Sequence, residues 1–300
     1  MFSFTKEQAI ISLGPVSFGG QPGHYPTVAI GGLFFKGAPD TTTAAGSLQT
    51  MFDISKQTGT PVLPDFFIRK ESYVEEILDF IEQELPKEYP FSIDITDAAI
   101  KVQTLQALAD RGLLKRTIYN SLHIGVTDEE RDTLKQCTPA MVILVSFNPK
   151  DKSPDGKIEV LENGAHLLDT GLFGVAKDVG IPNILVDTAA LAPGDNSGAA
   201  IASIPVIKEE YGLPTGCAIH NVVEKSTWLQ DHEHSKPCID AASNSAISLF
   251  GGDFAIFGPV QHASTVVPLL AWHDILISEY TEAYFGITPI DSHPRRKLLK

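Results

Sequence analysis

Residues 140–147 read AMVILVSF and contain an unbroken apolar run from Met141 to Val145. A strand that is exposed on one face alternates apolar and polar side chains, whereas an unbroken apolar run is typical of a strand covered on both faces. Strands of that kind occur in parallel sheets, because the helices that connect parallel strands pack against the sheet. This stretch therefore predicts an α/β fold with a parallel sheet.

Short apolar runs alternate with helix-like segments along the whole chain. The strand-like runs are 26–35, 61–68, 91–95, 116–121, 140–147, 183–189, 214–221 and 254–260. The helix-like segments that follow them are 47–59, 72–85, 97–112, 127–137, 166–180, 197–212, 239–252 and 263–280. Eight such units in 300 residues predict a (β/α)8 TIM barrel, in a single domain over residues 1–300. A doubly wound open sheet is the alternative architecture.

The ends of several helix-like segments carry helix-terminating or helix-capping residues. Gly112, Gly180 and Gly212 stand where helices are expected to end, because glycine readily adopts the left-handed conformation found there. Thr127, three residues before a glutamate, predicts a helix start. The segment 148–165 is rich in proline, glycine and charge, and predicts a long loop that could form a lid or a binding loop.

Composition narrows the classes of partner and location. The formal net charge is −14; an acidic surface repels phosphate backbones, so nucleic acid is not expected as a partner. Three cysteines, Cys137, Cys217 and Cys238, are too few for a disulfide framework and favour a reducing cytoplasm. No apolar stretch approaches the roughly 18 residues of a membrane span, and the N-terminus lacks a signal-peptide pattern. We therefore expect a cytoplasmic protein without a membrane segment.

Polar side chains stand at the ends of five successive predicted strands. They are Asp94, Asn120, Asn148, Asp187 and, after the seventh strand, His220 with Asn221. Asp and Asn favour turns and helix caps, which would explain any one of them alone. The active sites of TIM barrels lie at the carboxyl ends of the strands, so a series of five predicts a ligand site there.

The chemistry of this series favours a flat heterocycle. Carboxylates accept hydrogen bonds and carboxamides both donate and accept, which suits a pterin edged with amino, N–H and carbonyl groups. The strand ends carry no Lys or Arg, which argues against a phosphate clamp or a Schiff base. There are two metal alternatives. One is a zinc site formed by His232, His234 and Cys238 of DHEHSKPC (231–238) with Cys217 and His220, whose spacing matches no closed site; the other is a hard cation on Asp94 and Asp187. We expect no metal.

Five motifs stand out along the chain. They are GGQPGHYPTVAIGGLFF (19–35), RTIYNS (116–121), ILVDT (184–188), GLPTGCAIHN (212–221) and DFAIFGPV (253–260). These motifs resemble those of the MtrH family, named after a component of tetrahydromethanopterin S-methyltransferase. The resemblance extends over nearly the whole chain. The chain also resembles the soluble bacterial relatives in this family, the methylcorrinoid:tetrahydrofolate methyltransferases of glycine betaine demethylation.

The resemblance implies a pterin-binding barrel that forms a homodimer. It implies transfer of a methyl group from methylcob(III)alamin, a cobalamin-type corrinoid carried by a separate corrinoid protein, to the nitrogen at position five of tetrahydrofolate. The pterin-binding residues of the family map onto Asp94, Asn120, Asp187 and Asn221. Asn221 is expected nearest the reacting nitrogen, with Asp94 assisting the proton.

Three further candidates and several alternative functions remain open at this point. Asn148 and His220 belong to the polar series, and Asn196 lies in a segment that could reach the benzoyl-glutamate tail of the substrate. The alternatives are a tetrahydromethanopterin-specific methyltransferase and a non-catalytic subunit that binds a pterin or a corrinoid protein. A pterin synthase or a metal-dependent hydrolase on the same barrel is a third alternative.

Overall fold

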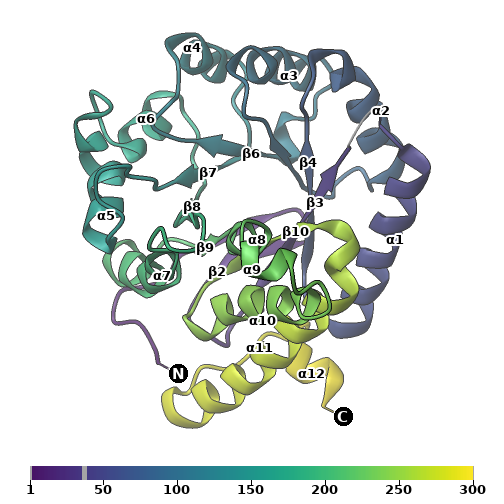
Figure 1. Ribbon diagram of the computed structural model, residues 1–300, viewed down its shortest axis with the longest axis vertical. Coiled ribbons are helices and arrows are strands. Elements are labelled where there is room, and N and C mark those ends of the chain that lie inside the picture. The colour runs from purple at the N-terminus through teal and green to yellow at the C-terminus, as the bar shows by residue number, and fades with distance from the viewer. Residues whose placement is uncertain (1, 36–38, 300) are drawn as a thin grey trace.

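The computed structural model describes residues 2–35 and 39–299. Eight parallel strands close into a barrel, in the order β10-β3-β4-β5-β6-β7-β8-β9 (Figure 1). They are β3 (Val28–Phe34), β4 (Val62–Phe67), β5 (Phe91–Asp94), β6 (Thr117–Leu122), β7 (Met141–Val145), β8 (Ile184–Asp187), β9 (Thr215–Cys217) and β10 (Phe254–Pro259). The predicted (β/α)8 TIM barrel is confirmed, and the open-sheet alternative is wrong.

Helices surround the barrel (Figure 1). They are α1 (Thr41–Thr58), α2 (Val74–Glu84), α3 (Ala98–Asp110), α4 (Asp128–Gln136), α5 (Pro154–Asn163), α6 (Leu172–Asp178), α7 (Gly198–Tyr211), α8 (His220–Glu224), α9 (Thr227–Gln230), α10 (Lys236–Leu249), α11 (Ala263–Phe285) and α12 (Pro294–Leu298). Single 3-10 turns lie at η1 (Glu71–Tyr73), η2 (Leu114–Arg116), η3 (Gly164–His166) and η4 (Val260–His262).

The predicted helix signals are confirmed. Gly112, Gly180 and Gly212 have left-handed φ angles of 70°, 79° and 67°. Thr127 precedes α4, and its Oγ1 accepts from Glu130 N at 3.1 Å. The hydroxyl thereby satisfies one of the backbone N–H groups that the first turn of a helix leaves without a partner.

An N-terminal hairpin closes one end of the barrel. Strands β1 (Ile10–Leu13) and β2 (Val16–Gly19) pair antiparallel. Phe18 is fully buried and packs edge-on against Phe254, at the start of β10, with ring centroids 6.3 Å apart. Val28, at the start of β3, belongs to the same apolar cluster. The amino end of the barrel is therefore filled with apolar side chains, and a ligand site has to lie at the carboxyl end.

The loop predicted over 148–165 is wrong, because α5 occupies most of it. Pro154 stands in the first turn of the helix, where a missing N–H costs nothing, and Ser153 Oγ accepts from Gly156 N at 3.2 Å. Lys157 on this helix is buried, and its Nζ donates to Thr188 O at 2.5 Å. Pro154 and Gly156, which predict a turn from the local sequence, thus stand at the start of a helix that packs on the barrel.

The predicted boundary of the seventh strand also differs from the structure. Strand β9 ends at Cys217, so His220 and Asn221 lie not on the strand but on the short helix α8. This helix lies inside the outer ring of helices and packs against β10 (Figure 1). Its position carries both side chains toward the mouth of the barrel.

Within residues 2–35 and 39–299, every helix is too short or too polar to cross a membrane.

Candidate functional site

A cavity of about 410 Å³ opens at the carboxyl end of the barrel strands. Its wall contains Asp94 from the end of β5, Asn120 from β6, Asp187 from the end of β8 and Asn221 from α8. Asp94 and Asn120 are direct neighbours in the parallel register of β5 and β6. The structure therefore brings these four polar groups into one cavity, while their part in binding stays a prediction.

The wall contains one further acid, Asp65, that sequence reasoning missed. Asp65 lies in the middle of β4 and is 1% exposed. The Asn120 side chain donates from Nδ2 toward both Asp65 oxygens at 3.5 Å. The sequence does contain a signal for Asp65, because it is an isolated acid inside the apolar run PVLPDFFI. A buried carboxylate is unfavourable without partners, so such an acid indicates a functional residue.

Burial perturbs the acids of this cavity. It raises the pKa of Asp65 to about 6, against hydrogen bonds from Ser92 and Asn120 that act to lower it. It also raises the pKa of Asp94, and the nearby charges of Asp65 and Asp187 add to that rise. Buried carboxyl groups that lie close together are unfavourable in their ionised forms, so a ligand that donates several N–H groups would stabilise those forms.

Asp187 is affected in the same way. Burial raises its pKa to about 6, although the Ala189 N–H, 2.7 Å from Asp187 Oδ1, and the charge of Lys157 act to lower it. The strand ends carry no basic residue, as the sequence indicates, but two helical lysines stand near the cavity. Lys157 lies behind Asp187, and Lys225 lines the cavity at the end of α8.

Two of the three further candidates lie outside the cavity wall. Asn148 is buried; its Oδ1 accepts from Lys150 N at 2.9 Å and its Nδ2 donates to Gly156 O at 3.1 Å, which holds the turn that leads into α5. Asn196 is exposed in the loop between β8 and α7, with a φ angle of 54°. The structure accounts for both residues by local turn geometry.

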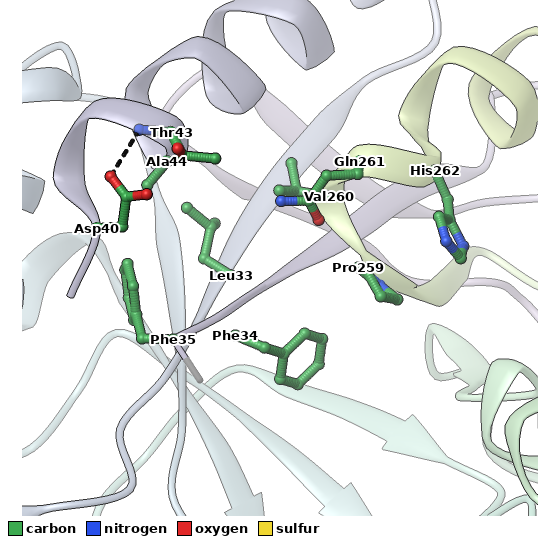
Figure 2. A pocket seen from close by; sticks show the side chains of 10 residues that line it. All are labelled: Leu33, Phe34, Phe35, Asp40, Thr43, Ala44, Pro259, Val260, Gln261 and His262. Atoms are coloured by element: carbon green, nitrogen blue, oxygen red, sulfur yellow. Dashed lines mark hydrogen bonds between the residues drawn. The ribbon is translucent and has the colours of Figure 1, made fainter. Parts of the chain in front are cut away.

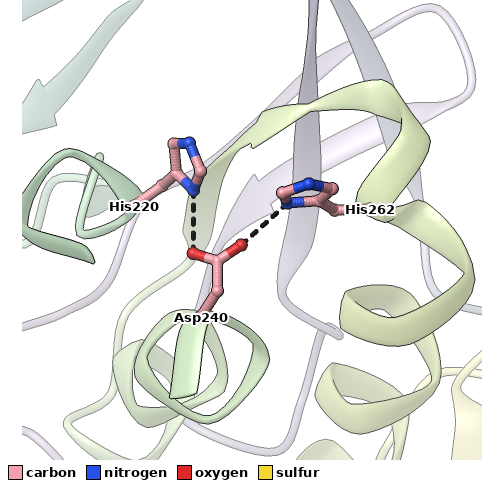
Figure 3. A group of neighbouring side chains, drawn as sticks. All are labelled: His220, Asp240 and His262. Carbon is pink, nitrogen blue, oxygen red and sulfur yellow. Dashed lines mark hydrogen bonds and ion pairs between the residues drawn. The ribbon is translucent and has the colours of Figure 1, made fainter. Parts of the chain in front are cut away.

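The third of these further candidates, His220, lines the cavity and belongs to a hydrogen-bonded group (Figure 3). Its Nδ1 lies 2.8 Å from Asp240 Oδ1, and His262 Nδ1 lies 2.8 Å from Asp240 Oδ2. The ligand-type atoms of these three residues lie within 4.8 Å of one another, the spacing of a group able to hold a metal ion. Of the residues that the zinc alternative invoked, His220 belongs to this group, whereas His232, His234, Cys238 and Cys217 do not.

A second cavity, of about 470 Å³, is lined by the side chains drawn in Figure 2. Leu33 and Phe35 approach it from the end of β3, and Pro259 and Val260 from the end of β10. Phe34 lines both cavities. Its lining is largely apolar, so the second cavity offers contact area but lacks the group of buried acids that distinguishes the first.

Comparison with known proteins decides the family. A model of the tetrahydromethanopterin S-methyltransferase MtrH subunit matches residues 6–290. The chain belongs to the MtrH family. The H subunit of tetrahydromethanopterin S-methyltransferase from Methanothermobacter thermautotrophicus is 33% identical over 313 residues, which cover 100% of both chains. The H subunit of the putative methyltransferase mtx from Methanosarcina barkeri is 31% identical over 313 residues, again covering 100% of both.

Solved structures support the fold of this MtrH-family chain. A dihydropteroate synthase of Coxiella burnetii in complex with pteroic acid superposes with a TM-score of 0.56 at 12% identity, covering 83% of this chain and 94% of that one. A dihydropteroate synthase of Xanthomonas albilineans superposes with a TM-score of 0.55 at 14% identity, covering 86% and 94%. Identities this low establish the shared barrel architecture alone.

Proposed function

We propose that this MtrH-family protein transfers a methyl group from methylcob(III)alamin to the nitrogen at position five of a reduced pterin, with tetrahydrofolate as the pterin. The observation that carries the proposal is a cavity at the barrel mouth that gathers acids, two of them buried, and carboxamides in one wall. The family adds the reaction class, because its named relatives are methyltransferases or methyltransferase subunits.

The buried side of the cavity is suited to hold the pterin. Asp65, Asp94 and Asp187 are acceptors when ionised, and the amino and N–H groups of a pterin are matching donors. Asn120 already directs Nδ2 toward Asp65, which leaves its carbonyl oxygen for the ligand. Binding would replace a like-charge cluster with charge-assisted hydrogen bonds, each contributing about 1.5–3 kcal/mol.

The transfer step is an in-line displacement. The lone pair of the pterin nitrogen forms the new bond to the methyl carbon, and the electron pair of the breaking cobalt–carbon bond stays on cobalt as cob(I)alamin. The nitrogen becomes cationic and then loses its proton. Asn221 lines the cavity from α8 and is exposed, a position from which its carbonyl oxygen can stabilise that developing charge.

The corrinoid is a second substrate in this proposal, delivered by a separate corrinoid protein at the open mouth. The barrel contributes orientation, and holding both reactants in attack geometry lowers the barrier by at most about 7–11 kcal/mol. The three cysteines are free, as expected of a protein in a reducing cytoplasm. Tetrahydromethanopterin is the second candidate acceptor, because the relatives' names specify it.

We also propose a homodimer, formed through the outer face of α11. Trp272, Leu276, Tyr280 and Tyr284 recur there every four residues and are all exposed, Trp272 to 52% and Tyr284 to 71%. Two copies of a chain with net charge −14 repel each other, which favours an interface with few carboxylates, and Glu279 is the one exposed carboxylate between Trp272 and Tyr284. A stripe of large apolar side chains at helical spacing is suited to pack against the same stripe of a second copy.

The deciding experiment is spectroscopic. Pure protein is mixed with methylcobalamin and tetrahydrofolate, then with tetrahydromethanopterin, and the cobalt chromophore is followed. The proposal predicts conversion of methylcob(III)alamin to cob(I)alamin with tetrahydrofolate and a stoichiometric methylated pterin. Conversion with tetrahydromethanopterin alone would favour the second acceptor. No conversion with either pterin would favour a non-catalytic subunit.

A further inference from the structure

The group His220–Asp240–His262 is a cluster of titratable side chains that the pterin-binding proposal leaves without a role (Figure 3). We propose that His220, oriented by Asp240, accepts the proton that the pterin nitrogen releases after methyl transfer, in place of Asp94, the residue expected from the sequence to assist with that proton. The inference rests on the proposed function and deepens it. His262 and Asp240 are positioning residues in this scheme, since neither lines the cavity that holds the pterin.

Asp240 fixes which nitrogen of His220 can act as a base. His220 Nδ1 lies 2.8 Å from Asp240 Oδ1, so this nitrogen carries the hydrogen that the carboxylate accepts. Nε2 is then left with its lone pair, as in other carboxylate–histidine pairs that accept protons. Burial works to raise the pKa of Asp240, but hydrogen bonds from His220 and His262 outweigh it and hold that pKa below its ordinary value. The carboxylate is therefore ionised and available to stabilise an imidazolium.

The surroundings hold this pair in place. Asp240 is 2% exposed, and Asn244 Nδ2 donates to its Oδ1 at 3.1 Å. The His220 ring lies against Gly258, where an added Cβ would come within 2.2 Å of the ring carbon Cδ2. Gly258 also has a φ angle of 79°, which side-chain-bearing residues rarely adopt. A rigid imidazole with one free nitrogen, beside the ligand cavity, is what a positioned base requires.

The position of His220 is suited to removing the proton from the methylated pterin nitrogen. It precedes Asn221, the residue proposed beside the reacting nitrogen, and both line the same cavity. The N–H bond of the cationic methylated pterin breaks, its electron pair returns to the pterin nitrogen, and the proton forms a new bond to His220 Nε2. Glu224 Oε1 lies 3.6 Å from Nε2, and its side chain is 43% exposed, which gives the proton a route to solvent.

A metal site is the competing interpretation of the same three residues. Each Asp240 oxygen faces a different imidazole Nδ1 at hydrogen-bond distance. Hydrogen bonds therefore account for the whole arrangement without an ion. The two interpretations differ in the protonation of Nδ1: the proton-acceptor scheme requires a hydrogen there, whereas a metal bound at Nδ1 would replace it.

The test combines a measurement on the resting protein with single-turnover kinetics. In protein labelled with ¹⁵N-histidine, the wild type is expected to show His220 as the Nδ1–H tautomer, and Asp240→Asn to lose that preference. Until its proton leaves, the cationic methylated pterin can return the methyl group to cob(I)alamin, so proton removal controls net transfer. In single turnovers, His220→Gln is therefore expected to slow net formation of cob(I)alamin about 100-fold, the lower range for general base catalysis, with pterin affinity within about twofold of wild type. His234→Gln, which removes an exposed histidine of the loop before α10, is the matched control and should react normally.

The pH profile separates a base from a structural residue. The charged or titratable groups that contact His220 or its partners are Asp240, Glu224, His262 and Lys236. Those that line the same cavity as His220 are Asp65, Asp94, Asp187, His123 and Lys225. A general base acts only in its unprotonated form, so the wild-type rate should rise with pH, and this limb should be missing in His220→Gln.

Several outcomes would overturn the inference. They are a normal rate in His220→Gln, an equal loss of rate and pterin affinity, and a stoichiometric zinc ion bound by the wild type whose removal abolishes transfer. A wild-type protein that transfers no methyl group would instead refute the proposed function itself.

Discussion

Replacing Asp187 by Asn should stabilise the free protein while weakening its binding of the pterin. Asp187 is 6% exposed, and burial raises its pKa to about 6 from an ordinary value of 3.8. An Asn side chain has nearly the same shape and keeps an oxygen for the Ala189 N–H, 2.7 Å from Asp187 Oδ1. The substitution therefore removes a buried charge with little change in packing.

The size of the effect follows from the pKa. A rise of roughly two units corresponds to about 3 kcal/mol of unfavourable free energy for the ionised form in the folded state. Because the folded-state pKa is raised, the folded protein retains this proton to higher pH than the unfolded chain does. The advantage of Asp187→Asn should therefore be about 3 kcal/mol at pH 8, shrink as the pH falls through about 6, and vanish near pH 4.

Denaturant unfolding at pH 8, 6 and 4 measures this advantage, and calorimetric titration with tetrahydrofolate measures affinity. The pterin should bind about 10–100-fold more weakly, because a charged acceptor becomes a neutral one. Asp169→Asn removes an exposed carboxylate and is the control, with a change within about 0.5 kcal/mol. A loss of stability at pH 8, or a pterin affinity equal to that of wild type, would refute the reasoning.

Three other predictions address the ligand, the reaction and the assembly. Asn221→Ala should reduce turnover far more than pterin affinity, as steady-state and binding measurements can show; equal losses would make it a plain binding residue. Pterin affinity should fall as the pH drops below about 6, because Asp65 and Asp187 gain protons there and their side chains lose the charge that accepts hydrogen bonds from the pterin. An affinity that does not change with pH would contradict this. Trp272→Glu should convert a dimer of the 32.4 kDa chain into monomers in light scattering, whereas a wild-type protein that is already monomeric would rule out the α11 interface.

The barrel was predictable because its signals are local. Apolar runs such as Met141–Val145 became strands, and the helix ends at Gly112 and Gly212 follow from a left-handed conformation that glycine adopts easily. The gathering of Asp94 and Asn120 followed from topology, since parallel strands end at the same edge of a barrel.

Other features depend on tertiary contacts that the local pattern does not encode. Lys157 is buried against Thr188 O, so a charged segment that reads as a loop is a packed helix. Asp65 lies inside its strand rather than at the strand end, where the ligand-binding residues of a barrel are expected. Asp240 stands 20 residues from His220 and on another helix, so their contact arises only when α10 packs beside the barrel mouth.

The central claim is that the buried acids at the barrel mouth hold the edge of a pterin. A crystal structure of the protein with bound tetrahydrofolate tests it most directly. We predict that the amino and N–H groups of the pyrimidine ring lie within hydrogen-bond distance of carboxylates among Asp65, Asp94 and Asp187, with the reacting nitrogen toward Asn221. A pterin seated in the apolar cavity beside Phe35 and Val260, with no contact to these acids, would contradict the account.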